Sequence, residues 1–536
     1  MLKKLLRLIQ QAIDKMLGYT SISKAIDINE MTISDDMSNA IQLWKQMYRD
    51  KSPWLDSEAG IYSLGLAKEI CNSFQQQMLS ELETKIIQPG MDDDVDEDKS
   101  NVDADITTRA QYLNNAYMKR LIKKLPQAVE KGLALGGMVI KPYVSNNELY
   151  FDFSFQGEFL PIAFDDDGNI TDIAFYDQFI AGEYVYTKIE RQTFSATEHK
   201  IVIENKAFKA KLVSKDDNVE QDLGKEIPLT DVDRWATISQ EPVTVENVDK
   251  PLYGFFRVPV ANNVDFDSPL GISLFSPAVG IIERVDNQFS RLDWEYEGGQ
   301  LAIDVDPTAV TYSTNYYGTQ IELDQCKNRL YRKLDLGTDE TYNQWTPALR
   351  DNNYIQGLNT YKCIIEDIIG LARGTISDPN TDAKTATEIK LMKQRTYITI
   401  TAMQEALESA ILDTVYAMNV FVDLYGLFVD GDYETRIDWN DSILTDTDTE
   451  LAQKIALEKE GILSKAEVRA WYTGESIATA KMAIDMMEKT KMQNQLNDLF
   501  GQLPEATLEG NDIDDTNNND KNQSNNQQID EEINND

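Results

Sequence analysis

Histidine is almost absent from this sequence, since His199 is the single copy among 536 residues. A Ser–His–Asp or Cys–His catalytic arrangement would have to use it. His199 lies between two strand-like runs, and we interpret it as a surface residue. Cysteine is also scarce: Cys71, Cys326 and Cys363 lie far apart and form no C-x-x-C pair. This spacing argues against a disulfide framework and a zinc site, and is typical of a reducing cytoplasm.

Sequence motifs of catalysis and nucleotide binding are missing too. The chain contains no H-E-x-x-H, no G-x-S-x-G, no G-x-G-x-x-G and no G-x-x-x-x-G-K-[ST]. A carboxylate pair acting as general acid and base stays open, because 91 residues are Asp or Glu and no spacing distinguishes any of them. We predict a protein that is not an enzyme and that has no cofactor and no metal site.

Long apolar runs are absent. None reaches the roughly 18 residues that a membrane-spanning helix needs. The N-terminal segment has apolar residues at helical spacing from Leu2 to Leu17, but Arg7 and Asp14 interrupt the run and no small-residue cleavage site follows. We expect an amphipathic helix that docks on protein, with binding to a membrane surface as the alternative.

Basic residues are few relative to acidic ones: 51 Lys and Arg stand against 91 Asp and Glu, a formal net charge of −40. A tight, non-specific grip on nucleic acid requires Lys and Arg that displace phosphate counterions. The surface as a whole should repel DNA, so that any contact with it is local and weak. The length predicts three or four structural units, because a domain usually has about 100–200 residues.

The hydrophobic pattern predicts a mixture of helices and a β-rich region, in a consistent order along the chain. Helical spacing dominates residues 1–90, and residues 107–133 form a further helix. Residues 91–105 form an acidic run that we interpret as a solvated loop. A calcium loop is the alternative, but Glu97 occupies the sixth position, where such a loop needs Gly. Residues 137–260 read as a β meander with a hairpin turn at Asp165–Asn169.

The second half of the chain reads as helices interrupted by one mixed segment. Ser276 as the N-cap and Pro277 at the first helical position open a helix that ends at Gly298 and Gly299. A mixed segment follows at 301–350, then a helix at 352–371 and a break at 373–385. The next parts are a helix of about 40 residues at 386–425 and a strand at 433–439. Short helices at 442–499 and a polar tail at 504–536 come last. Ser464 and Glu467 form a capping-box pattern in the short helices. The tail is rich in Asn, Gln and Asp and is predicted to be disordered.

This order of parts resembles the core of tailed-phage portal proteins, in particular those of siphophages of Gram-positive bacteria. The sharpest local similarity is the segment Ile376-Ser-Asp-Pro-Asn-Thr-Asp-Ala-Lys-Thr-Ala-Thr-Glu-Ile, at the entrance to the longest helix. The Asp165–Asn169 hairpin is similar to these proteins as well. The resemblance covers about residues 10–500, apart from the acidic 91–105 loop.

The resemblance implies an α+β, multi-domain subunit with a wing, a helical stem, an α/β clip, a long wing helix and a helical crown. Its parts would be a wing at 1–276, stem helices at 277–300 and 351–372, a clip at 301–350, a tunnel loop at 373–385, the long wing helix and strand at 386–440, a crown at 441–503 and a tail at 504–536. Such subunits form a ring, usually of twelve copies, at one capsid vertex. Double-stranded DNA is packaged and ejected through the ring, which meets terminase, the head–tail adaptor, and the major capsid and scaffold proteins. The implied location is the virion, and the host cytoplasm during assembly, without a membrane.

By this resemblance, the tunnel loop and the stem carry the candidate site residues. Those of the loop are Arg373, Ser377, Asp378, Asn380, Asp382 and Lys384. Those of the stem are Glu283, Asp286, Asp293, Glu366 and Asp367, which we expect to face the channel or a neighbouring subunit. Arg373 and Lys384 are expected to touch backbone phosphate transiently, with salt bridges to Asp378 or Asp382 as the alternative. Two other functions stay open, namely an acidic adaptor or scaffold that binds only proteins, and a hydrolase with an unrecognised carboxylate site.

Overall fold

The computed structural model describes two compact units, residues 1–446 and 447–536, which we treat separately. The described residues are 33–89, 107–212, 223–266, 268–299, 348–379, 386–439, 447–473 and 477–500, with the backbone of short strands between 302 and 345. They combine helices and strands, so the α+β class is confirmed. The predictions of an N-terminal amphipathic helix, an acidic 91–105 loop and a disordered tail concern segments outside these residues.

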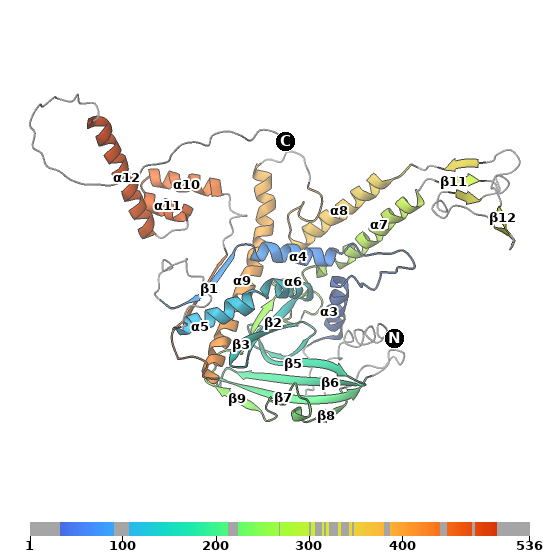
Figure 1. Ribbon diagram of the computed structural model, residues 1–536, viewed down its shortest axis with the longest axis horizontal. Coiled ribbons are helices and arrows are strands. Elements are labelled where there is room, and N and C mark those ends of the chain that lie inside the picture. The colour runs from blue at the N-terminus through green and yellow to red at the C-terminus, as the bar shows by residue number, and fades with distance from the viewer. Residues whose placement is uncertain are drawn as a thin grey trace, which may run out of the picture. The chain divides into compact units, whose positions relative to one another are not determined.

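Four segments build the helical part that begins the first unit (Figure 1). They are α3 (Asp35–Tyr48), α4 (Leu66–Leu79), α5 (Arg109–Ala116) with the π-helical turn η1 (Tyr117–Ile122), and α6 (Leu125–Leu135). The sequence predicted one helix over 107–133, and the structure divides it. Pro126 sits in the first turn of α6, where its missing N–H is tolerated, so a new helix begins there.

The prediction that helical structure continues to about residue 90 was wrong for residues 82–87. The structure has strand β1 at Leu82–Ile87, paired antiparallel with β16 (Glu434–Trp439). Only Ile86 of this strand is fully buried, while Glu83 and Lys85 are exposed. Local spacing fitted a helix, but the distant strand β16 supplies the backbone hydrogen bonds that make the segment extended.

The β meander is confirmed, as two sheets. One has the order β10-β2-β3, from Gly254–Arg257, Gly137–Ser145 and Glu148–Phe155. The other has the order β4-β5-β6-β7-β8, and β9 also pairs with β7. Its strands are β4 (Phe159–Phe164), β5 (Ile170–Ala181), β6 (Tyr184–Ser195), β7 (Lys200–Lys211), β8 (Lys225–Ile227) and β9 (Val243–Glu246). Asp165 accepts hydrogen bonds from the backbone N–H groups of Asp167 and Asn169, which shapes the predicted hairpin turn.

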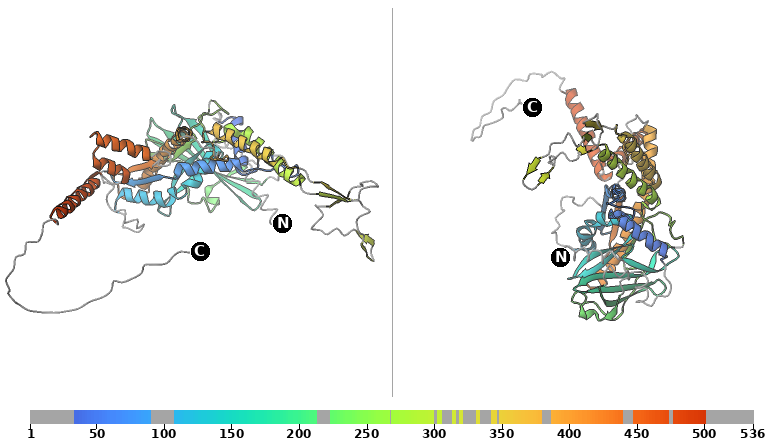
Figure 2. Two further views of the ribbon diagram at one scale, coloured as in Figure 1. Left: turned by 90° about the horizontal axis from the view of Figure 1, so that it is seen from above. Right: turned by 90° about the vertical axis from the view of Figure 1, so that its right-hand side faces the viewer.

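Helices α7 (Val279–Gly298) and α8 (Asp351–Ile369) lie side by side and flank the mixed segment (Figures 1 and 2). A 3-10 turn, η4 (Ser276–Ala278), leads into α7. The Ser276 side chain caps neither segment, so this predicted cap was wrong. In the mixed segment, β11 (Ala302–Val305) lies between β14 (Tyr331–Lys333) and β15 (Tyr342–Trp345). A separate pair consists of β12 (Ser313–Asn315) and β13 (Gly318–Gln320).

The long helix is confirmed as α9, which has 39 residues from Ala386 to Leu424. At 1.5 Å a residue it is roughly 58 Å long. Its apolar residues at helical spacing from Ile400 to Val422 are buried, and the helix packs against β2, β10 and α4. Gly254 of β10 makes this approach possible, because a Cβ there would stand 1.9 Å from the Ala410 carbonyl oxygen of α9. The core of the first unit therefore forms around α9.

The second unit contains α10 (Thr447–Lys459), α11 (Lys465–Thr473) and α12 (Ile477–Phe500). The predicted capping box opens α11: the Ser464 N–H donates to Glu467 Oε2 at 2.6 Å, and the Glu467 N–H donates to Ser464 Oγ at 3.2 Å. Local sequence therefore determined where this helix begins.

Candidate functional site

The candidate site lies where α8 ends and the chain turns through residues 371–379 toward α9. Gly370 ends α8 with a positive φ of 85°. A Cβ at this position would stand 2.5 Å from Thr399 Oγ1 of α9, so glycine fits both the backbone conformation and the close packing. Thr396, also of α9, accepts a hydrogen bond from the Ala372 N–H at 2.7 Å. Both threonines fix the beginning of the loop against α9.

Glu366 is the organising residue of this turn. Its side chain is fully buried, and one carboxylate oxygen accepts from the N–H groups of Ile376 (2.6 Å) and Ser377 (2.9 Å). The other oxygen accepts from Ser377 Oγ (2.7 Å) and from the Gly374 N–H (3.3 Å). A buried carboxylate is stable only when it is hydrogen-bonded in this way. The loop is therefore folded around a side chain of α8.

This finding corrects two sequence-based expectations, because neither Glu366 nor the loop residue Ser377 is exposed to line a channel. Glu366 does not face a channel or a neighbour, because its carboxylate lies inside its own chain. Ser377 is buried for the same reason, as a donor to Glu366. Asp378 is exposed, and its N–H donates to Asn359 Oδ1 of α8 at 2.7 Å. Three further loop predictions, Asn380, Asp382 and Lys384, lie outside the described residues.

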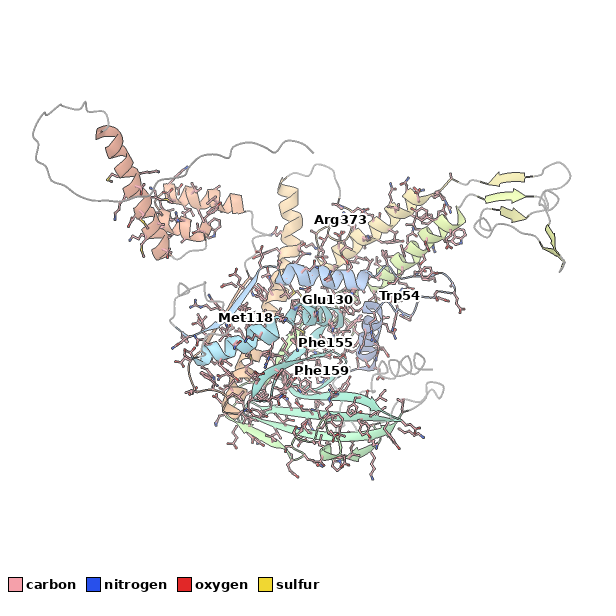
Figure 3. The ribbon with its side chains drawn as sticks, viewed as in Figure 1. Trp54, Met118, Glu130, Phe155, Phe159 and Arg373 are labelled. Atoms are coloured by element: carbon pink, nitrogen blue, oxygen red, sulfur yellow. The ribbon has the colours of Figure 1, made fainter. Side chains whose placement is uncertain are left out.

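Two arginines share the carboxylate of Asp367 beside the loop (Figure 3 marks Arg373). Arg373 donates through Nε at 3.2 Å and through a terminal nitrogen, and Arg395 of α9 lies 3.7 Å from the same carboxylate. Arg395 also donates to the Asp367 carbonyl oxygen. The Arg373 hydrogen bond holds the pKa of Asp367 below its usual value, and the same contact raises the pKa of Arg373. Arg373 thus pairs with Asp367 rather than with Asp378.

Both arginine side chains keep a large exposed fraction: 59% for Arg373 and 55% for Arg395. Solvent therefore reaches them, and a guanidinium has five N–H donors that can serve more than one acceptor. Arg395 was missed by sequence reasoning. It lies 22 residues beyond Arg373 in the middle of a helical pattern, and only the return of α9 past α8 brings the two together.

Asp286 ties α7 to the N-terminal part of the chain. It is buried and accepts from Trp54 Nε1 and from the Leu64 N–H, both at 2.9 Å. Burial raises its pKa, and these two hydrogen bonds oppose that effect in part. The expectation that Asp286 faces a channel or a neighbour is corrected, because Trp54 covers it. Glu283 and Asp293, by contrast, are exposed on α7.

Glu295 and Arg350 join the ends of α7 and α8 where the mixed segment leaves and returns. Arg350 donates to Glu295 through its N–H and Nε, both at 3.1 Å, and through a terminal nitrogen at 2.7 Å. These bonds lower the pKa of Glu295 and raise that of Arg350. Sequence reasoning missed this pair, because 55 residues separate its members. The clamp fixes where the mixed segment begins and ends.

The α7–α8 pair also exposes large apolar side chains. Trp294 has an exposed fraction of 66%, and the others have between 37% and 44%: Tyr296, Leu349, Ile355, Ile364 and Ile368. Apolar groups gathered on one helical hairpin in this way are typical of a protein–protein contact surface.

Three features of the described residues bear on other functions. No group of three or more His, Cys, Asp or Glu side chains there could hold a metal ion. No helix in that part of the chain is both long and apolar enough to cross a membrane. His199 is an exposed turn residue, as predicted, and its Nδ1 lies 2.8 Å from Asp249 Oδ1.

No model of a known protein family matches the sequence, and no curated protein matches it significantly. The resemblance to portal proteins therefore rests on the order of the elements and on the 376–389 segment.

Proposed function

We propose that this chain is the portal subunit of a tailed bacteriophage: a structural protein, not an enzyme, that forms a ring through which double-stranded DNA enters and leaves the capsid. The observation that carries the proposal is the connected set α7, mixed segment, α8, loop and α9. In it, α8 is tied at its start to α7 by Glu295 and at its end to the loop by Glu366. A rigid helical pair with a fixed loop suits a conduit wall, where neighbouring copies must repeat one geometry.

The apolar side chains exposed along the α7–α8 pair support a ring of copies. In a ring, each hairpin would pack against the hairpins on both sides, so that residues such as Trp294 and Ile368 become buried. The subunit would take the division into wing, stem, clip, tunnel loop and crown that the resemblance implies. Terminase, the head–tail adaptor, and the capsid and scaffold proteins would be its partners.

The charge supports passage of DNA rather than its capture. With a net charge of −40 the chain should repel phosphate over most of its surface, which a conduit requires. In the proposed ring, the half-exposed guanidinium groups of Arg373 and Arg395 are the candidates for brief contact with backbone phosphate. Because both already share Asp367, that contact would be weak and reversible.

The test is the native mass of the purified protein together with electron micrographs of the particle. A ring of twelve copies would have a mass of about 12 × 60.9 ≈ 731 kDa and a central hole. A large particle without a hole, or a monomer that stays monomeric with scaffold and capsid proteins, would contradict the proposal and favour the acidic adaptor.

A further inference from the structure

Few of the described side chains of the second unit, residues 447–536, are fully buried. Among its described side chains, only Ala470 and Ala480 are buried. Nine large apolar residues there are instead exposed: Ile455, Leu457, Ile462, Tyr472, Ile477, Met482, Met486, Met487 and Met492. A few short helices gain most of their stability from packing an apolar face, so two alanines are too little. Something else must cover this unit.

The exposed apolar residues run around α12 rather than along one side. Ile477, Met482, Met487 and Met492 follow at intervals of five residues, with exposed fractions between 56% and 65%. Each step of five residues turns the helix by about 140°, because an α-helix has about 3.6 residues per turn. The four side chains therefore point in four different directions. A helix whose apolar residues face several directions cannot bury all of them against a single neighbouring helix.

The helices α10, α11 and α12 contact one another, yet the apolar side chains named above remain exposed among the described residues. Lys465 lies 3.6 Å from Glu488, and the Arg469 guanidinium lies 3.7 Å from Met487 Sδ. Between α10 and α11, the Lys454 ammonium stands 4.7 Å over the Trp471 ring. These are contacts of long charged side chains at the rim, which contribute little to stability.

The charge of α12 favours further copies of itself as the covering partner. The helix has three lysines (481, 489 and 491) and three acidic residues (485, 488 and 498), so its net charge is 3 − 3 = 0. The whole chain has −40. Copies of α12 would therefore not repel one another as strongly acidic surfaces would, and Lys and acidic side chains could pair between them.

The polar tail that follows α12 is poorly suited to cover it. Residues 501–536 contain no aromatic residue, and one lysine stands against ten acidic residues, a net charge of −9. Such a segment has too little apolar surface to replace a core.

We propose that α12 is a self-association helix, enclosed by the α12 helices of neighbouring copies. The spacing of five residues is not the alternating spacing of three and four that a two-stranded coiled coil requires, so more than one neighbour must contact each helix. This inference rests on the proposed homo-oligomer and identifies a surface through which its copies associate. It assigns a function to the methionines, whose flexible side chains adapt to the irregular gaps between packed helices.

The experiment replaces Met486, which has an exposed fraction of 67%, by the photo-crosslinking amino acid benzoylphenylalanine in the full-length chain. The matched control carries the same replacement at Met118, an exposed methionine of the first unit, at 42%. After irradiation, we expect the variant at 486 to give a ladder of crosslinked chains beyond the dimer, with both partners mapped to 477–500. The control should give no crosslink to that segment.

Crosslinks from 486 only within one chain, only to dimers, or at the same level as nonspecific crosslinks of the control would overturn the inference. The native mass of each variant is measured first and separates the two proposals. A ring without crosslinks between α12 helices contradicts the self-association helix alone. Crosslinked ladders from particles that have no central hole contradict the portal proposal alone.

Discussion

Replacement of Glu366 tests the central feature of the candidate site, namely that a buried carboxylate of α8 holds the loop. Glu366→Ala removes the acceptor for three backbone N–H groups and one hydroxyl. A hydrogen bond to a charged group contributes about 1.5–3 kcal/mol, and such contributions do not add fully within one cluster. Because water can reach Gly374 and Ile376, which are half-buried, we expect a loss of about 3–5 kcal/mol in the stability of the loop.

Glu366→Gln should be much milder, and the geometry explains why. The amide oxygen can keep the Ile376 and Ser377 N–H groups, while its NH2 group donates to Ser377 Oγ. The Gly374 N–H already donates to this hydroxyl at 3.0 Å and loses only its long bond to Glu366, while the Ser377 hydroxyl hydrogen loses its acceptor on Glu366. We expect a loss of about 1–2 kcal/mol for this variant.

Hydrogen exchange of the loop amides measures both effects directly. In the wild type, the Ile376 and Ser377 amides should exchange slowly, because opening the loop is required. In Glu366→Ala they should exchange about a hundredfold faster or more, since about 1.4 kcal/mol corresponds to a factor of ten. Glu283→Ala, an exposed change on α7, is the control and should leave the loop amides unaffected. Equal protection of these amides in the wild type and in Glu366→Ala would refute the role of Glu366.

Three further predictions concern stability. Arg109 is buried and donates to Asn419, to the Phe428 carbonyl oxygen and to Asp423, so Arg109→Ala should cost about 3–5 kcal/mol in urea unfolding; a loss below 1 kcal/mol would contradict this. Although burial alone would raise it, the pKa of Glu190 is held well below its usual value by Lys141 and Lys188. A carboxylate with a lowered folded-state pKa stabilises above its unfolded pKa, here about 4.5, and that contribution is lost as the pH falls below it. The melting temperature of Glu190→Gln should therefore fall less steeply between pH 5 and pH 3 than that of the wild type, and parallel curves would count against the ion cluster. Gly254→Ala should destabilise the protein, because its Cβ would stand 1.9 Å from the Ala410 carbonyl oxygen. The control Gly280→Ala, in α7, meets nothing within 4 Å and should stabilise by about 0.5–1 kcal/mol. Equal melting temperatures of these two variants would contradict the close packing at Gly254.

Features that depend on neighbours in sequence were predictable. The stripe along α9 repeats at helical spacing from Ile400 to Val422, and burial of that stripe needs only a core to face. The capping box at Ser464 and the hairpin turn at Asp165 are formed by side chains that bind their own backbone a few residues away. Such bonds form in almost any tertiary context, so local sequence is sufficient to indicate them.

Features that depend on distant partners were not predictable. Residues 82–87 have a spacing compatible with a helix, and they are a strand because β16, at 434–439, pairs with them. Asp286 and Glu366 resemble the exposed acids Glu283 and Asp293 in sequence, but Trp54 and the 374–377 loop enclose them.

The sequence by itself determined most of the order of helices and strands, with β1 as an exception, and also the acidic character and the resemblance on which the proposed function rests. The tertiary structure decided which carboxylates are solvated and which hold the fold together. The physical reason is that a buried charge is stable only where enough donors converge on it, and here those donors come from segments that are separated along the chain. The pairing of Arg373 and Arg395 around Asp367 has the same origin, since only the packing of α8 against the returning α9 places both beside one carboxylate.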